Sequence, residues 1–208
     1  MMGFVSPRSS HAEAARTKER IVRVAVEDAS RIGVDGLTIG ALADRLGMSK
    51  AGVVGPFGSR ENLQRAALEQ AGRIFRAAVI EPLAELPPGA GRLARLIDIW
   101  IEYLTECPFP GGCFVTAAST ELDGRPGPLR DRLRTVVTDW RIFLTAEVTA
   151  AQAETSALRR PAEEVATVLI GISMAVNQEI QLLGDRSAAD RGRAAMRNAA
   201  GLPAPTEL

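Results

Sequence analysis

Hydrophobic residues recur every three or four positions along most of the chain, which is the spacing of amphipathic helices and not of strands. The first such stripe ends directly before Gly33, and glycine commonly follows the last turn of a helix. Its members are Ile21, Val24, Ala25, Ala29 and Ile32. We therefore predict a first helix over residues 16–32, preceded by a disordered tail over residues 1–15.

A short helix is predicted next, with one apolar face. Thr38 precedes this face, and its hydroxyl can accept a hydrogen bond from a free backbone N–H at the helix start. The apolar positions are Leu42, Ala43 and Leu46. Gly47 stands where the helix must end, because glycine adopts the left-handed backbone conformation without strain.

A second short helix follows the first almost directly. Ser49 can cap it, and Pro56 limits its length because proline disfavours the helical conformation at Gly55. Two short helices joined by a tight turn form a helix-turn-helix pattern, in which the second helix lies in the major groove of DNA. Ser59 then begins a longer helix, which we predict to end near Ala84.

The remaining part of the chain carries further apolar stripes with helical spacing. Breaker-rich segments that contain proline and glycine separate these stripes. They predict helices over residues 92–106, 113–122, 129–153, 161–183 and 187–201. Together with the preceding segments, they predict an all-α fold of about nine helices.

Residues 17–63 resemble the DNA-binding domain of the TetR family of transcriptional regulators. The matching segments are TKERIVRVAVEDASRIGVDGLTIGALADRLGMSK at residues 17–50 and FGSRENL at residues 57–63. The resemblance implies a helix-turn-helix DNA-binding domain over residues 16–62 and a larger ligand-binding and dimerisation domain over residues 63–208. It also implies a cytoplasmic homodimer, most simply a repressor, that binds a pseudo-palindromic double-stranded operator and responds to a small apolar effector.

Several residues of the motif are expected to contact DNA. A cation in the first turn of a recognition helix reaches base edges or phosphates, so Lys50 is the strongest candidate. Small residues after it allow the helix to approach the groove closely, and hydroxyls at helix starts can hold phosphate as well as cap. The predicted contacts are Arg16, Thr17, Thr38, Ser49, Lys50, Ala51, Gly52, Ser59 and Arg60.

The end of the recognition helix departs from the family pattern. Family members usually carry an aromatic residue, most often tyrosine, followed closely by a second aromatic residue or histidine. Here Val54, Gly55 and Pro56 occupy these places, so a phosphate-contacting hydroxyl is missing. The departure leaves an alternative open, in which a small-molecule-binding protein or enzyme retains a vestigial DNA-binding module.

Six of the nine aromatic residues lie between positions 100 and 143. An apolar space with a few polar groups is typical of a small-molecule site, and the resemblance implies such a pocket. The predicted ligand contacts are Trp100, Tyr103, Phe114, Trp140, Phe143, Met174, Asn177 and Gln178. The alternative for each aromatic side chain is an ordinary place in the core.

The most apolar run of the chain covers residues 165–176 and includes small residues that let another helix approach. It is too short to span a membrane, so we predict a buried helix and no membrane partner. TetR-like proteins dimerise through their last two long helices, which implies an interface at Val165, Leu169, Ile172 and Val176. A helix in the core of a monomer is the alternative.

Charge and composition favour a binding protein over an enzyme. Residues 1–65 hold ten basic and seven acidic residues, and the remainder holds fifteen and eighteen, so a basic N-terminal part precedes an acidic body. His11 is the sole histidine, and no catalytic or metal-binding set accompanies it, so no cofactor or metal is expected. Cys107 and Cys113 are expected to be inert core thiols, with a redox pair as the alternative.

Overall fold

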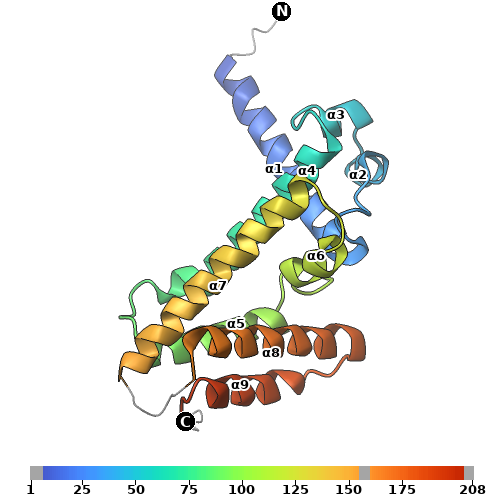
Figure 1. Ribbon diagram of the computed structural model, residues 1–208. Coiled ribbons are helices and arrows are strands. Elements are labelled where there is room, and N and C mark those ends of the chain that lie inside the picture. The colour runs from blue at the N-terminus through green and yellow to red at the C-terminus, as the bar shows by residue number, and fades with distance from the viewer. Residues whose placement is uncertain (1–6, 155–159, 204–208) are drawn as a thin grey trace, which may run out of the picture.

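The computed structural model describes residues 7–154 and 160–203, and within them every regular element is a helix (Figure 1). The predicted all-α fold is confirmed. The N-terminal head consists of α1 (Pro7–Ile32), α2 (Ile39–Leu46), α3 (Lys50–Val54) and the first part of α4 (Arg60–Phe75). α1 packs along α4, and its N-terminal turns extend beyond the other helices of the head (Figure 1).

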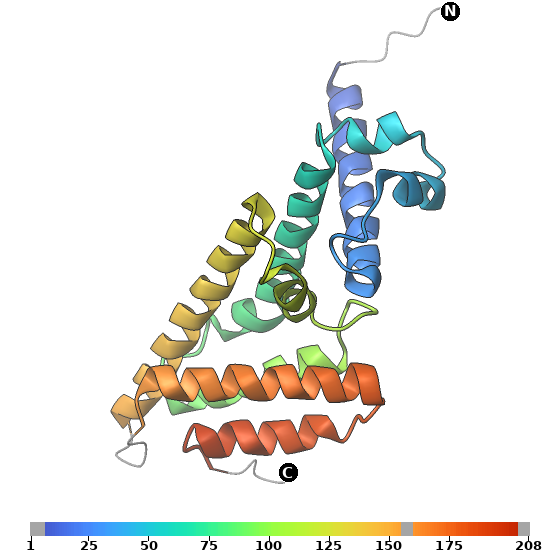
Figure 2. The same ribbon diagram turned by 45° about the vertical axis from the view of Figure 1, so that its right-hand side comes forward.

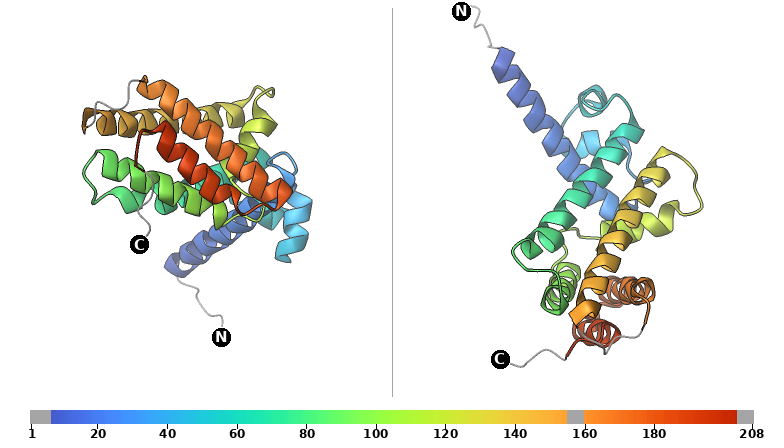
Figure 3. Two further views of the ribbon diagram at one scale, coloured as in Figure 1. Left: turned by 90° about the horizontal axis from the view of Figure 1, so that it is seen from below. Right: turned by 60° about the vertical axis from the view of Figure 1, so that its left-hand side comes forward.

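The body consists of five helices below the head. They are α5 (Ala90–Thr105), α6 (Phe114–Leu122), α7 (Pro128–Glu154), α8 (Ala162–Leu183) and α9 (Ala188–Ala199). α8 and α9 lie side by side at the end of the molecule opposite the head (Figure 2). Seen from below, α9 lies between α5 and α8 (Figure 3). Within the body, α6 lies nearest to α1 of the head, and it contacts α1, α4 and α7.

The first helix begins nine residues earlier than predicted, so residues 7–15 are helical instead of a disordered tail. Pro7 suits a helix start, because its fixed φ is helical and its missing N–H would have no partner there. The alanine-rich segment that follows has a high helix propensity, which explains the extension. The rest of the predicted tail, residues 1–6, lies outside the described residues.

The helix predicted over residues 59–84 changes its hydrogen-bonding pattern near its C-terminal end. α4 ends at Phe75 and continues as a π-helical turn, η1 (Arg76–Ile80), and a 3-10 turn, η2 (Glu81–Leu83). Pro82 lies within η2. Its ring would collide with the carbonyl four residues earlier in a regular α-helix, so a wider turn before it relieves that collision.

α8 is long and apolar enough to span a membrane by length and composition, with a mean hydropathy of 1.3 over its best window. The run at residues 165–176, on which the sequence-based expectation rests, is still shorter than a membrane span. In this fold α8 contacts α5, α7 and α9, and its inward side chains join the core. A core helix of a helical bundle accounts for this hydropathy.

Candidate functional site

The helices of the helix-turn-helix are capped by the residues that the sequence predicts. The Thr38 hydroxyl accepts a hydrogen bond from the Ala41 N–H at 3.1 Å, and the Ser49 hydroxyl accepts one from the Gly52 N–H at 3.0 Å. Gly47 adopts a left-handed φ of 62° after α2, and its N–H bonds back to the end of that helix. These caps place α2 and α3 at a fixed angle.

α3 presents its first residues to solvent. Lys50 and Ala51 are exposed and Gly52 is half-buried, whereas Val53 is fully buried and anchors the helix in the head. α3 has five residues and ends at Val54, as Pro56 predicts. A short helix with a lysine and two small residues on its open side can approach DNA closely, which supports the assignment of Lys50.

The other predicted DNA contacts have different surroundings. Arg16 is exposed on α1, and Thr17 lines a shallow groove beside Gly55 and Pro56 at the end of α3. Ser59 caps α4 by accepting a hydrogen bond from the Asn62 N–H at 3.1 Å. Thr17, Gly55 and Pro56 line the same groove, so this part of α1 lies beside the end of α3.

Arg60 has an internal role that the sequence did not indicate. Its Nε donates a hydrogen bond to the Leu37 carbonyl at 2.7 Å, and its Nη2 donates one to the Asp35 carbonyl. The guanidinium therefore holds the loop before α2, and fewer of its donors remain for phosphate. Lys50 is the better candidate for a direct DNA contact.

A cavity of about 210 Å³ lies in the body where α4, α5, α6, α7 and α8 meet. Of the predicted ligand contacts, Trp100, Trp140 and Met174 line it. Ten further residues line the cavity, and the sequence did not indicate most of them as ligand contacts. These residues are Phe75, Leu104, Cys113, Val115, Thr116, Ser119, Val136, Val137, Ile170 and Ser173.

Phe75 is the most informative residue that sequence reasoning missed. Its ring packs edge-on against Tyr103 at 5.2 Å and against Trp140 at 5.0 Å between ring centroids. Trp140 also packs edge-on against Trp100 at 4.9 Å and stacks on Phe143 at 5.7 Å. The cluster joins α4 to α5 and α7. In the sequence, the only sign of this role is that Phe75 is an isolated aromatic residue near the end of the helix that links head and body.

The other predicted ligand contacts lie outside the cavity. Phe114 is buried against Phe109 at 6.2 Å, so its ring belongs to the core. The Asn177 Oδ1 accepts a hydrogen bond from the Cys113 N–H at 2.9 Å and so fixes the start of α6. Gln178 is exposed on α8. Tyr103 and Phe143 do not line the cavity, but they pack against Phe75 and Trp140, which do.

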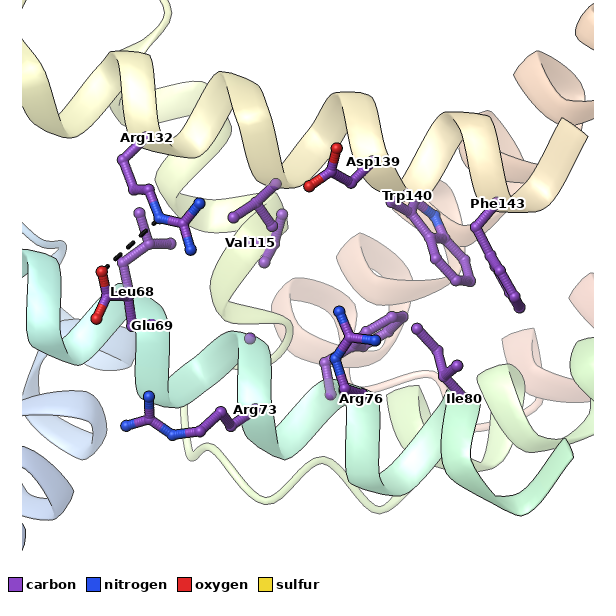
Figure 4. A pocket seen from close by; sticks show the side chains of 13 residues that line it. Leu68, Glu69, Arg73, Arg76, Ile80, Val115, Arg132, Asp139, Trp140 and Phe143 are labelled. Carbon is purple, nitrogen blue, oxygen red and sulfur yellow. Dashed lines mark ion pairs between the residues drawn. The ribbon is translucent and has the colours of Figure 1, made fainter. Parts of the chain in front are cut away.

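A larger cleft of about 690 Å³ separates α4 from α7 next to the cavity (Figure 4). Trp140 and Phe143 form part of its apolar floor together with Phe75. Charged side chains stand around its rim, and Arg132 forms an ion pair with Glu69 across it at 3.8 Å. The cleft therefore combines an apolar interior with a polar entrance.

Cys107 and Cys113 are free thiols, the first half-buried and the second buried. Burial, the larger cause, raises the pKa of Cys107 to about 11 despite a hydrogen bond from the Phe109 backbone that lowers it. Burial also raises the pKa of the neighbouring Tyr103 hydroxyl. A thiol with a raised pKa holds little thiolate near neutral pH, which supports the expectation of inert core thiols.

Glu121 connects the body to the head, a role that the sequence did not indicate. It lies on α6, and its two carboxylate oxygens accept hydrogen bonds from the Val34 and Asp35 N–H groups, each at 2.7 Å. Gly33 has a left-handed φ of 80°, and a Cβ there would lie 2.8 Å from this carboxylate. Glycine at this turn therefore permits the close approach of α6.

The family model described as "Tetracyclin repressor-like, C-terminal domain" matches residues 89–196, which is more than half of the chain. This chain belongs to the TetR family. A TetR transcriptional regulator from Chloroflexus aurantiacus superposes with a TM-score of 0.80 at 22% identity, covering 91% of this chain and 95% of that chain. No curated protein in the comparison matches this chain.

Two further TetR-like structures carry ligands. A transcriptional regulator from Saccharomonospora viridis in complex with choline has a TM-score of 0.73 and 19% identity, covering 88% of this chain and 95% of that chain. AibR in complex with isovaleryl coenzyme A and operator DNA has a TM-score of 0.70 and 16% identity, covering 89% of this chain and 97% of that chain. At these identities the likeness establishes the fold alone.

The residues predicted to form the TetR dimer interface lie mostly inside the protomer. Val165 and Leu169 are fully buried and Val176 is 3% exposed, whereas Ile172 is half-buried. This face of α8 packs against neighbouring helices of the same chain. The prediction is corrected for these three side chains, because they have no surface left to offer a partner subunit.

A different face of the TetR body is open. Ile142 on α7 is 64% exposed and Met174 on α8 is 41% exposed. A shallow groove on α7 runs up to Glu163 at the start of α8 and is lined by small side chains. Its members are Thr138, Arg141, Ile142, Thr145, Ala146, Thr149, Ala150, Ala153 and Glu163. The small residues on this side of α7 allow another helix to pack closely.

Proposed function

We propose that this TetR-family chain is a cytoplasmic homodimeric repressor that a small, largely apolar effector releases from a pseudo-palindromic operator. The DNA-binding domain covers residues 16–62, extended at its start by the first turns of α1, and the ligand-binding and dimerisation domain covers residues 63–208. Regulators of this family are generally not enzymes. Among the described residues no group of three or more side chains is arranged to hold a metal ion.

One observation carries the proposal. α6 contributes Val115, Thr116 and Ser119 to the cavity wall and Glu121 to the turn after α1. A molecule that enters the cavity therefore pushes on the same helix that holds the head. α4 forms a second connection, because it begins in the head and supplies Phe75 to the cavity.

The direction of the response follows from binding energetics. An effector that prefers the conformation with displaced heads shifts the population toward it, whereas equal affinity for both conformations shifts nothing. The coupling is reciprocal and typically about 1 to 3 kcal/mol, so operator DNA weakens effector binding by the same factor. In a dimer the displacement alters the spacing of two recognition helices, which must fit major grooves about 34–36 Å apart.

The open face of α7 and α8 is our proposed dimer interface in place of the buried one. Ile142 and Met174 are large apolar side chains that a monomer would leave in water. Thr145 and Thr149 follow Ile142 at the spacing of one helix face. An isologous contact between two such faces would pair each helix with its copy.

A gel-shift titration with DNA flanking the chain's own gene tests the proposal. We expect a salt-sensitive complex with one dimer per operator. Compounds that quench the two tryptophans, Trp100 and Trp140, are then added to the complex, because both side chains line the cavity. The proposal requires that at least one such compound dissociates the complex.

Lys50→Ala is expected to weaken operator binding by roughly 1 to 3 kcal/mol and to relax sequence preference, because Lys50 is exposed in the first turn of α3. Fluorescence anisotropy with labelled operator and with unrelated DNA measures both effects. Arg65→Ala removes an exposed cation from α4 and serves as the control. Unchanged affinity of Lys50→Ala on every DNA would remove Lys50 from the interface.

Glu121→Gln is expected to lower operator affinity about tenfold in the absence of effector, because an amide cannot accept from both backbone N–H groups. Amide hydrogen exchange at Val34 and Asp35 should become faster. Glu106→Gln, at an exposed position after α5, is the control. If exchange at Val34 and Asp35 were unaffected, Glu121 would not hold the head.

The departure at Val54, Gly55 and Pro56 favours a second function, a carrier of small apolar molecules with a vestigial head. That function predicts effector binding with no specific operator. The gel-shift titration separates the two, because a carrier would give only weak binding with no preference among sequences.

A further inference from the structure

The cavity and the cleft adjoin each other. They share four lining residues, Phe75, Val115, Val136 and Trp140. The cavity holds about 210 Å³ and the cleft about 690 Å³. A single molecule can therefore place one end in the cavity and the other end between α4 and α7 (Figure 4).

The cavity suits an uncharged apolar group. The hydroxyls of Ser119 and Ser173 donate to the carbonyls of Val115 and Ile170, each at 2.7 Å, so they need no partner from a ligand. Among the described residues, none of the buried side-chain N or O atoms without a partner lies in the cavity wall. Because a cavity of about 150 Å³ can hold benzene, this one can hold an aromatic ring with a few further carbon atoms.

Three arginines line the cleft, and the described residues provide partners for two of them. Arg132 pairs with Glu69 at 3.8 Å, and Arg73 donates to the Gln70 amide oxygen at 2.7 and 3.0 Å. In the described part of the chain, the Arg76 guanidinium has no hydrogen bond or ion pair within bonding distance. Figure 4 shows Arg76 reaching from the lower wall into the space below Trp140.

Asp139 adds a negative charge to the cleft, so it disfavours a doubly charged anion more than a singly charged one. It lines the opposite wall on α7, where no described cation pairs with it (Figure 4). A group with two negative charges near Arg76 would be repelled by this carboxylate, whereas a single negative charge can stay on the α4 side. A carboxylate matches the planar guanidinium and can accept two hydrogen bonds from it.

We infer that the effector is an amphipathic monoanion, with an aryl or branched alkyl group in the cavity and a carboxylate beside Arg76. The inference rests on the proposed function, since it takes this site to be the effector site. The inference refines the small apolar effector proposed above. A purely apolar molecule would fill the cavity but would make no contact with the Arg76 guanidinium in the cleft. Arg76 is then a specificity-determining residue, and the aromatic cluster recognises the apolar end.

Isothermal titration calorimetry with matched probes tests the inference. The probes are phenylacetate, 4-phenylbutyrate and 6-phenylhexanoate, each compared with the alcohol of the same carbon skeleton. For at least one pair, we expect the acid to bind the wild-type protein about tenfold more tightly than its alcohol. High salt should reduce this preference, because the guanidinium is exposed to solvent.

Arg76→Gln should lower the affinity of that acid about tenfold and leave the affinity of the alcohol within about twofold. Retained alcohol binding also shows that the variant is folded. Arg134→Gln is the matched control, because Arg134 is an exposed arginine on α7 outside the cleft lining. We expect it to bind both probes like the wild type.

Two outcomes would overturn the inference. In one, no acid of the series binds more tightly than its alcohol. In the other, an acid preference survives in Arg76→Gln. Neither bears on operator binding, which the gel-shift titration measures without these probes, so failure of the repressor proposal would be seen separately as absence of a specific DNA complex.

Discussion

Ile142→Asp is expected to convert the dimer into monomers and to abolish specific operator binding. Ile142 is 64% exposed in the protomer and lies on the proposed interface of α7 and α8. An isologous interface contains this position twice, so the substitution would bury two unpaired charges, each costing about 3 kcal/mol or more. A single head reads only one half-site, so affinity should fall by more than about a hundredfold.

Sedimentation velocity at micromolar concentration and a gel shift measure the two consequences of this change. Ala195→Asp places the same charge on an exposed position of α9 away from the α7–α8 face, and it should leave the dimer intact. A dimeric Ile142→Asp protein would place the interface elsewhere. A wild-type protein that stays monomeric would exclude the dimer proposal itself.

Glu147→Ala is expected to destabilise the protomer by about 3 to 5 kcal/mol, because it leaves a largely buried guanidinium without its counter-ion. Glu147 on α7 and Arg92 on α5 form an ion pair at 3.0 Å, and their side chains are 8% and 17% exposed. Burial raises the pKa of Glu147, and the Arg92 guanidinium opposes that rise. In a chain of this length the loss should lower the melting temperature by roughly 6 to 20 °C.

Thermal and urea unfolding of the variant measure this loss. Glu164→Ala is the control, because its pair with Arg160 is exposed at 3.7 Å and should contribute less than about 1 kcal/mol. Replacing both Arg92 and Glu147 with methionine should recover much of the stability, because no charge is then left buried. If Glu147→Ala unfolded like the control, the pair would not hold α5 against α7.

The positions of the helices and of their caps were largely predictable from the sequence. Thr38, Gly47, Ser49 and Ser59 act through bonds to residues three or four positions away, so their role is local. The start of α1 was missed because a helix with no apolar stripe in its first turns is set by propensity and by Pro7.

The partners of each face could not be predicted in the same way. α8 is apolar around most of its circumference, so its pattern does not tell which side meets the protomer's own core. The fold turned Val165 and Leu169 inward and left Met174 41% exposed beside the cavity. Periodicity identifies a buried face, whereas the identity of its partner depends on how distant helices cross.

The candidate functional sites also combine features that the sequence predicts with features that depend on tertiary contacts. The sequence by itself determined that this is an all-α chain with a helix-turn-helix that exposes Lys50, because those features follow from contacts between neighbouring residues. Only the tertiary structure decided that Phe75 joins the aromatic cluster, that Glu121 holds the turn after α1, and that Arg60 serves a loop. These contacts join residues 23 to 87 positions apart or bring separate helices together, and the chain must pack before such groups can meet.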